Sequence, residues 1–192
     1  MAAPVDFYFD FSSPYGYFAS QKIDALAAKH GRETRWRPYL LGVAFKTTGG
    51  APLPSIPVKG PYHLRDMVRT AKYLGVKYRH PSVFPISSVS ACRAFYWMDA
   101  KDPKRAKDLA RSLYAAYFLD NVVGVAAKSG LSADEVRAGI GDQATKDRTK
   151  AEVDKAIAIG AFGSPYIVVD GEPFWGSDRL EQIDKWLATG GW

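Results

Sequence analysis

Residues 5–15 of the chain have the sequence VDFYFDFSSPY. Apolar side chains alternate with other residues along this stretch, a period of two that is typical of a β-strand, here expected to end near Ser12. Ser12 and Ser13 then offer hydroxyl groups that cap a helix, and Pro14 suits the first helical position. The chain is therefore expected to begin with a strand, a tight turn and a helix.

The segments around this start extend the pattern to both ends of the chain. Gly31 closes the first helix, and residues 34–39 alternate again and predict a second strand. Near the C-terminus, residues 166–169 form an apolar β-run, and residues 170–175 supply a turn and a returning strand. A last helix is expected from Ser177. The simplest architecture joins these strands into one mixed sheet.

The middle of the chain is helical in pattern. Residues 42–61, which are rich in glycine and proline, predict a long irregular loop without regular hydrogen bonding. After it, helices are expected over residues 62–75, 87–100 and 103–119, from a capped start at residues 131–135, and over residues 145–159. We therefore expect an α/β protein in which residues 1–42 and 150–192 form the sheet domain and residues 43–149 form a helical insertion domain.

Composition narrows the class of protein. The chain has 192 residues, 47% hydrophobic and 24% charged, which is typical of a globular protein and argues against disorder or a coiled coil. Lysine and arginine number 26 against 20 acidic residues, a formal charge of +6. This excess suits an anionic ligand but is too diffuse to indicate nucleic acid.

The chain has one cysteine and three histidines, which limits its redox and metal chemistry. Cys92 alone excludes an intramolecular disulfide, a cysteine-based zinc cluster and a dithiol redox motif. The histidines lack metal-ligand spacing, so no metal site is expected. The start of the chain lacks a leader pattern, and no run approaches the roughly 20 apolar residues that cross a bilayer. We expect a cytoplasmic protein without a membrane partner.

Three motifs could carry chemistry, and each has a purely structural alternative. Residues 12–14 lie at a helix start, where a hydroxyl and backbone N–H groups can stabilise an anion, or where a serine simply caps the helix. Ser164-Pro165 precedes a strand, and a cis proline there would turn backbone groups towards an extended ligand, whereas a trans proline would only begin an edge strand. Ser177-Asp178 could bind an ammonium or carboxyl group, or cap the last helix.

The order and spacing of these motifs resemble the thioredoxin fold, with Ser13 to Gly16 at the position of its redox motif and Pro165 at that of its cis proline. The motifs at residues 6–15, 83–85, 162–165 and 174–180 resemble, nearly end to end, the 2-hydroxychromene-2-carboxylate isomerase family. This family is the bacterial relative of the kappa-class glutathione transferases within the DsbA-like group. The resemblance implies a thioredoxin-like mixed sheet with a large helical insertion, and a homodimer.

The resemblance also implies glutathione as cofactor. Ser13 would hydrogen-bond its sulfur, and the Ser164 backbone, before cis Pro165, would pair with its cysteinyl part. Ser177 and Asp178 would hold the γ-glutamyl end. On the same basis Lys59, in the long loop, matches a lysine that approaches the glycyl carboxylate, whereas Gly50 stands where several relatives carry asparagine.

The implied substrate is an aromatic acid, and the implied reaction is its glutathione-dependent cis–trans isomerisation in aromatic catabolism. Aromatic candidates for its pocket are Phe45, Tyr62, Phe84 and Trp175, and cationic candidates are Lys46, Lys59 and Arg65. Most such aromatics lie in the core of a protein and most such cations are solvated. Two other functions fit the sequence: a kappa-like glutathione transferase, and a non-catalytic binding protein on a thioredoxin scaffold.

Overall fold

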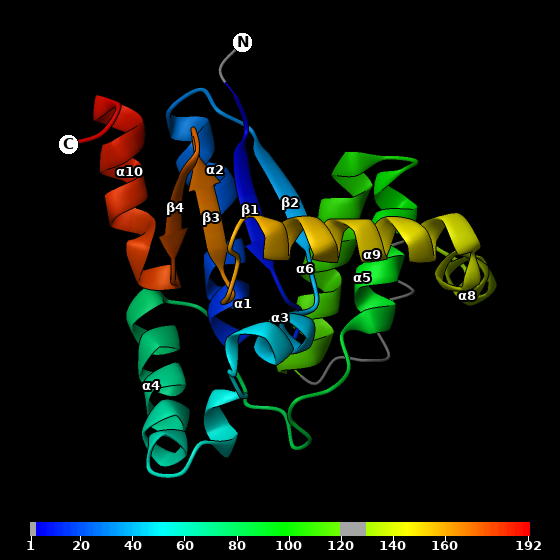
Figure 1. Ribbon diagram of the computed structural model, residues 1–192, viewed down its shortest axis with the longest axis horizontal. Helices are drawn as coiled ribbons and strands as arrows, with labels where there is room; N and C mark the ends of the chain where they lie inside the picture. The colour runs from blue at the N-terminus through cyan, green and yellow to red at the C-terminus, as the bar shows by residue number, and fades with distance from the viewer. Residues whose placement is uncertain (1–2, 120–129) are drawn as a thin grey trace.

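A computed structural model describes residues 3–119 and 130–192 of the chain (Figure 1). Its centre is a four-stranded sheet in the order β2-β1-β3-β4. β1 is parallel to β2 and antiparallel to β3, and β3 is antiparallel to β4, so the sheet is mixed as expected. The strands are β1 (Val5–Phe9), β2 (Thr34–Pro38), β3 (Tyr166–Val169) and β4 (Glu172–Trp175).

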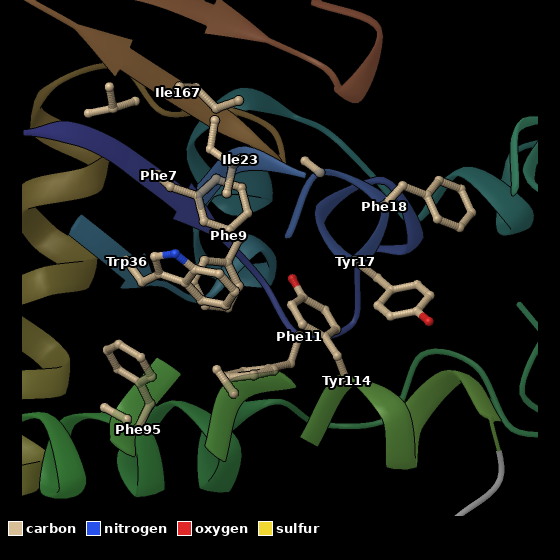
Figure 2. Close-up of a cluster of buried hydrophobic side chains, with 14 of the residues drawn as sticks. Phe7, Phe9, Phe11, Tyr17, Phe18, Ile23, Trp36, Phe95, Tyr114 and Ile167 are labelled. Atoms are coloured by element: carbon tan, nitrogen blue, oxygen red, sulfur yellow. The ribbon is translucent and has the colours of Figure 1, made fainter. Parts of the chain in front are cut away.

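The alternation in β1 places its side chains on two faces that pack into separate cores. Phe7 and Phe9 lie in the larger core, together with Trp36 of β2 and Ile167 of β3 (Figure 2). Tyr8 lies on the opposite face, in a smaller core. Both faces are therefore covered.

Helices surround the sheet on both sides and extend beyond its edge (Figure 1). The larger core includes side chains of α1, α5, α6 and α10, whereas the smaller core includes side chains of α3 and α9. The helices are α1 (Pro14–Ser20), α2 (Ile23–Lys29), α3 (Leu41–Thr48), α4 (Lys59–Leu74), α5 (Val89–Asp99), α6 (Pro103–Leu119), α8 (Ala133–Gly141), α9 (Gln143–Ala158) and α10 (Leu180–Thr189), with 3-10 turns η1 (Leu53–Ser55) and η3 (Ser177–Arg179).

The first helix differs from the expected single helix ending at Gly31, because it is divided into α1 and α2. At the break, Gln21 and Lys22 donate their N–H groups to carbonyls only three residues earlier. The Ser20 hydroxyl also donates to the Tyr17 carbonyl at 2.6 Å. A serine hydroxyl that binds a backbone carbonyl competes with the regular helical pattern, and this accounts for the break.

The prediction of an irregular loop over residues 42–61 was wrong. Most of that segment is ordered as α3, η1 and the first turn of α4. Gly49 has φ of 71° and ends α3, and a Cβ on Gly60 would clash with the Pro54 carbonyl oxygen. Glycine and proline here define the ends of short helices and a close backbone approach, instead of preventing regular structure.

The other helices agree with the sequence pattern within a few residues. The capped start predicted near residue 131 is a capping box, in which the Ser132 hydroxyl accepts from Glu135 N–H at 3.1 Å. The division into two domains stays a prediction, and its boundary at residue 150 falls inside α9. Within the described residues, no helix is long and apolar enough to span a bilayer.

Candidate active site

Ser13 lies at the turn between β1 and α1, where its extended backbone (φ −88°, ψ 116°) makes it the N-cap of α1. Its hydroxyl oxygen accepts the N–H of Gly16 at 3.1 Å, as a capping serine does. The same hydroxyl donates to the backbone carbonyl of Ser164 at 2.7 Å, although the two residues are 151 positions apart in the sequence. Ser13 therefore caps the helix and also contacts the segment before β3.

The Ser164-Pro165 peptide bond is cis, as the resemblance implied. The loop that contains it is fixed on two sides. Tyr39 donates its hydroxyl to the Gly163 carbonyl at 2.7 Å, and the N–H of Gly176 donates to the Pro165 carbonyl at 3.1 Å. The cis-proline loop is thereby held to the end of β2 and to the turn after β4.

Two glycines permit close approach around this loop. A Cβ on Gly16 would lie 2.8 Å from the Ser164 hydroxyl oxygen, which is closer than a real Cβ contact allows. A Cβ on Gly163 would collide with the Trp175 indole. Trp175 consequently lies against the cis-proline loop, with 54% of its surface exposed and its ring 4.8 Å from that of Phe162.

Ser177 and Asp178 follow β4 and form the 3-10 turn η3. The expectation that they cap the last helix was wrong, because the N-cap of α10 is Arg179 and no side chain makes the capping bond. Ser177 is buried, whereas the Asp178 side chain is 70% exposed and forms an ion pair with Arg179 at 2.9 Å. Since η3 packs against α1, the Asp178 turn and the Ser13 turn lie on the same side of the molecule.

The other sequence-predicted residues are spread over α3, α4 and the segment before α5. Phe45 is half-buried, and its ring lies so close to Gly50 that a Cβ there would be 2.6 Å from the ring, so an asparagine at this position requires Phe45 to move. Within the described residues, none of these side chains hydrogen-bonds to Ser13, Ser164 or Asp178. They are Phe45, Lys46, Lys59, Tyr62, Arg65 and Phe84.

These six side chains differ in their exposure and in the residues around them. Lys46 and Lys59 are exposed, at the last turn of α3 and the first residue of α4, on either side of residues 49–58. Tyr62 is 63% exposed and accepts a hydrogen bond from Arg69 at 3.0 Å. Phe84 is half-buried and its ring lies 5.0 Å from that of His80. Arg65 lines an open hollow along α4 with Leu64, Val68, Arg69 and Lys72.

Sequence reasoning missed a polar network next to Ser13. The hydroxyl of Tyr15 donates to the Asp66 carboxylate at 2.6 Å and lies 3.3 Å from Nδ1 of His63, both on α4. Burial and the bond to Asp66 raise the pKa of Tyr15, and burial lowers the pKa of His63, so both are neutral at pH 7. Nothing in residues 59–74 signals this contact beforehand, because it depends on how α4 packs on α1.

Asp10 lies within residues 6–15, the first segment that carries the family resemblance, but it was not predicted to have a role. Only 2% of its surface is exposed, and its carboxylate accepts hydrogen bonds at the turn that holds Ser13. A carboxylate at the end of an apolar strand is the one signal that the sequence offered.

The buried Cys92 has its pKa raised by burial, which suits an inert thiol. The described part of the chain has no cluster of side chains suited to a metal ion.

Known proteins resemble this chain over nearly its whole length, in sequence and in fold. A family model described as a DSBA-like thioredoxin domain matches residues 4–188. A 2-hydroxychromene-2-carboxylate isomerase of Sphingobium xenophagum is 29% identical, over 97% of this chain and 99% of its own. Glutathione s-transferase kappa 2 of Caenorhabditis elegans is 26% identical, over 96% and 91% of the two chains. A solved 2-hydroxychromene-2-carboxylate isomerase superposes with a TM-score of 0.84 at 25% identity, over 97% and 95% of the chains.

Proposed function

Because the chain belongs to the DSBA-like thioredoxin domain family and places a serine hydroxyl against its cis-proline loop, we propose that it is a glutathione-dependent isomerase. The proposed reaction interconverts 2-hydroxychromene-2-carboxylate and trans-o-hydroxybenzylidenepyruvate, or a close analogue, in aromatic catabolism. The observation that carries the proposal is the 2.7 Å contact between Ser13 and Ser164, because it joins the two elements that a bound thiol peptide needs. Relatives named as isomerases and as a glutathione transferase support the same chemistry.

The donor set along this side of the molecule fits glutathione. Ser13 supplies a hydroxyl for the sulfur, and the backbone of Ser164 supplies polar groups for the cysteinyl part. The exposed Asp178 supplies a charge for the γ-glutamyl ammonium group, with Ser177 beside it. Lys59 is proposed for the glycyl carboxylate.

Glutathione held here would supply a thiol whose anion could add to the conjugated double bond of the ring-opened acid, allow rotation about the resulting single bond, and leave again as the double bond re-forms. A free thiol has a pKa of about 8.5 and is mostly protonated at pH 7. Ser13 must therefore favour the anion. In the proposed complex with glutathione, the Ser13 hydroxyl turns from the Ser164 carbonyl and donates to the glutathione sulfur. This hydrogen bond lowers the pKa of the thiol, because it stabilises the charged form.

The substrate acid is proposed to lie between this sulfur position and the aromatic side chains around it. Trp175 lies against the cis-proline loop and offers an exposed indole face. Phe45, Tyr62 and Phe84 are proposed as further apolar contacts, and Lys46 as the partner of the substrate carboxylate. A cytoplasmic homodimer is part of the same proposal.

The experiment that tests the function combines the purified protein with glutathione and the chromene acid, and follows the formation of the trans product. We expect conversion only when glutathione is present, with no net consumption of it. A transferase, which the kappa relative makes the second candidate, would instead give a stable conjugate with a chloro-nitrobenzene and leave the chromene acid unchanged. Failure of the protein to bind glutathione would contradict both the isomerase and the transferase function.

Replacing Asp178 with alanine should weaken glutathione binding. Loss of a hydrogen bond to a charged group costs roughly 1.5–3 kcal/mol, so we expect the dissociation constant to rise about tenfold or more, as measured by calorimetry. Asp184→Ala is the matched control, because this α10 carboxylate is also solvent-accessible and pairs with Lys29 at 2.7 Å. Equal affinities for glutathione in the Asp178 and Asp184 variants would contradict the assignment.

A further inference from the structure

The buried carboxylate of Asp10 lies directly behind the turn that carries Ser13. One of its oxygens accepts the backbone N–H of Ser12 at 2.7 Å and the Ser12 hydroxyl at 2.8 Å. The other oxygen accepts the backbone N–H of Leu41, the first residue of α3, at 2.7 Å. Three uncharged donors thus converge on one carboxylate that is 2% exposed.

The backbone of Asp10 joins the same turn to the rest of the site. Its N–H donates to the Ser164 hydroxyl at 2.9 Å, and its carbonyl accepts the N–H of Ser13 at 2.9 Å. The same carbonyl accepts the hydroxyl of Tyr114, from α6, at 3.1 Å. Asp10 therefore hydrogen-bonds to both Ser13 and Ser164. The proposed function depends on the 2.7 Å hydrogen bond between these two residues.

Only a carboxylate can accept all three donors together, the two backbone N–H groups and the Ser12 hydroxyl. It presents two acceptor oxygens and no hydrogen, whereas the amide of an asparagine presents one oxygen and one NH₂ group. In an Asp10→Asn variant the NH₂ group would face either the N–H of Leu41 or the donors of Ser12. Either Leu41 at the start of α3 or Ser12 at the turn would then lose its hydrogen bonds to residue 10, and Ser12 precedes Ser13 directly.

We propose that Asp10 is a positioning residue that holds the Ser13 hydroxyl where it can donate to the sulfur of bound glutathione. This inference rests on the proposed function of the site. Asp10 does not touch the ligand itself, and it acts through Ser12, Ser13 and Ser164. Its charge is tolerated in the interior because the three N–H and O–H donors replace water.

Positioning and charge have opposite effects on the bound thiol, which makes the role measurable. A carboxylate near the sulfur disfavours a second negative charge, so removing it would by itself lower the thiol pKa. A misplaced Ser13 hydroxyl would instead raise the thiol pKa towards about 8.5, the value for a free thiol. The direction of the change therefore separates the two roles.

The test is a titration of protein-bound glutathione by the ultraviolet absorbance of its thiolate, in wild type and Asp10→Asn. Positioning predicts that the bound thiol pKa rises in the variant and that kcat falls by about tenfold to a hundredfold, with a smaller change in KM. A fall in the thiol pKa, or an unchanged one, would overturn the proposal. If wild type itself binds glutathione without acidifying it, the proposed function fails and not merely this inference.

Two further variants keep the result interpretable. Asp24→Asn is the matched control, because this α2 carboxylate accepts from Trp36 at 3.0 Å on another part of the fold; we expect it to affect stability without moving the thiol pKa. If Asp10→Asn does not fold, Leu41→Pro removes one donor to Asp10 and keeps the charge. Proline suits the first position of a helix, and Leu40 before it is already extended. The thiol pKa should again rise, and an unchanged value in a folded Leu41→Pro protein would overturn the proposal.

Discussion

Replacing Ser13 with alanine is expected to reduce the turnover number of the proposed isomerisation about 10²–10³-fold. That is the effect of removing one hydrogen-bond donor from a developing anion in an enzyme site. The variant should still bind glutathione, because Ser164 and Asp178 remain, but the bound thiol should return to a pKa of about 8.5. Steady-state kinetics and the thiolate titration measure these two effects separately.

Ser13 also caps α1, so part of the effect could be structural. Loss of the bond from Gly16 N–H costs about 1 kcal/mol of stability. Ser20→Ala is the control, because it also removes a buried hydroxyl from α1. That hydroxyl donates to the Tyr17 carbonyl. We expect that variant to be less stable with normal turnover. Full turnover in a folded Ser13→Ala protein would refute the role of the hydroxyl.

Replacing Phe9 with alanine should have the largest effect on stability, because its ring lies at the centre of the aromatic core (Figure 2). It stacks on Phe7 at 4.9 Å and contacts Phe11, Trp36 and Tyr114 at 5.2, 5.4 and 5.5 Å between ring centroids. Truncating a buried phenylalanine costs about 3–5 kcal/mol, since the cavity is not refilled by its neighbours. We therefore expect the free energy of unfolding to fall by that amount.

Urea unfolding monitored by tryptophan fluorescence would measure the change. Phe162→Ala is the matched control, because that ring is 43% exposed and should cost less than about 1 kcal/mol. A Phe9→Ala loss as small as that of the control would contradict the central position of this ring. Retained glutathione binding by the folded fraction would show that the core supports the site without contacting the ligand.

The extent to which sequence predicted the fold depended on the kind of segment. The alternation that begins at residue 5 and the apolar run at residues 166–169 are local signals, and both predict strands that are present. The first strand was expected to end near Ser12, but β1 ends at Phe9, because residues 10–13 form the turn before α1. Residues 42–61 gave the opposite result. Glycine and proline there were interpreted as breaking structure, but Gly49 and Gly60 fit the ends of helices that tertiary packing stabilises.

The candidate site likewise contains one feature that was predicted and others that were not. The resemblance indicated the cis bond before Pro165, and that bond is present. It gave no sign of the Tyr15 contact with α4, because that contact depends on the packing of two helices and joins residues 51 positions apart in the sequence. The roles assigned to Ser177 and Asp178 as helix caps failed because a 3-10 turn precedes α10.

The sequence by itself determined the strands and most of the helices, since each depends on side chains a few positions apart, and its family resemblance indicated the residues that are proposed to bind glutathione. Only the tertiary structure decided which of them meet. The antiparallel pairing of Tyr8 with Tyr166 brings the ends of β1 and β3 together, and so places Ser13 against Ser164 and buries Asp10 behind them. Such long-range pairing depends on the packing of the whole chain, which no local pattern of residues records.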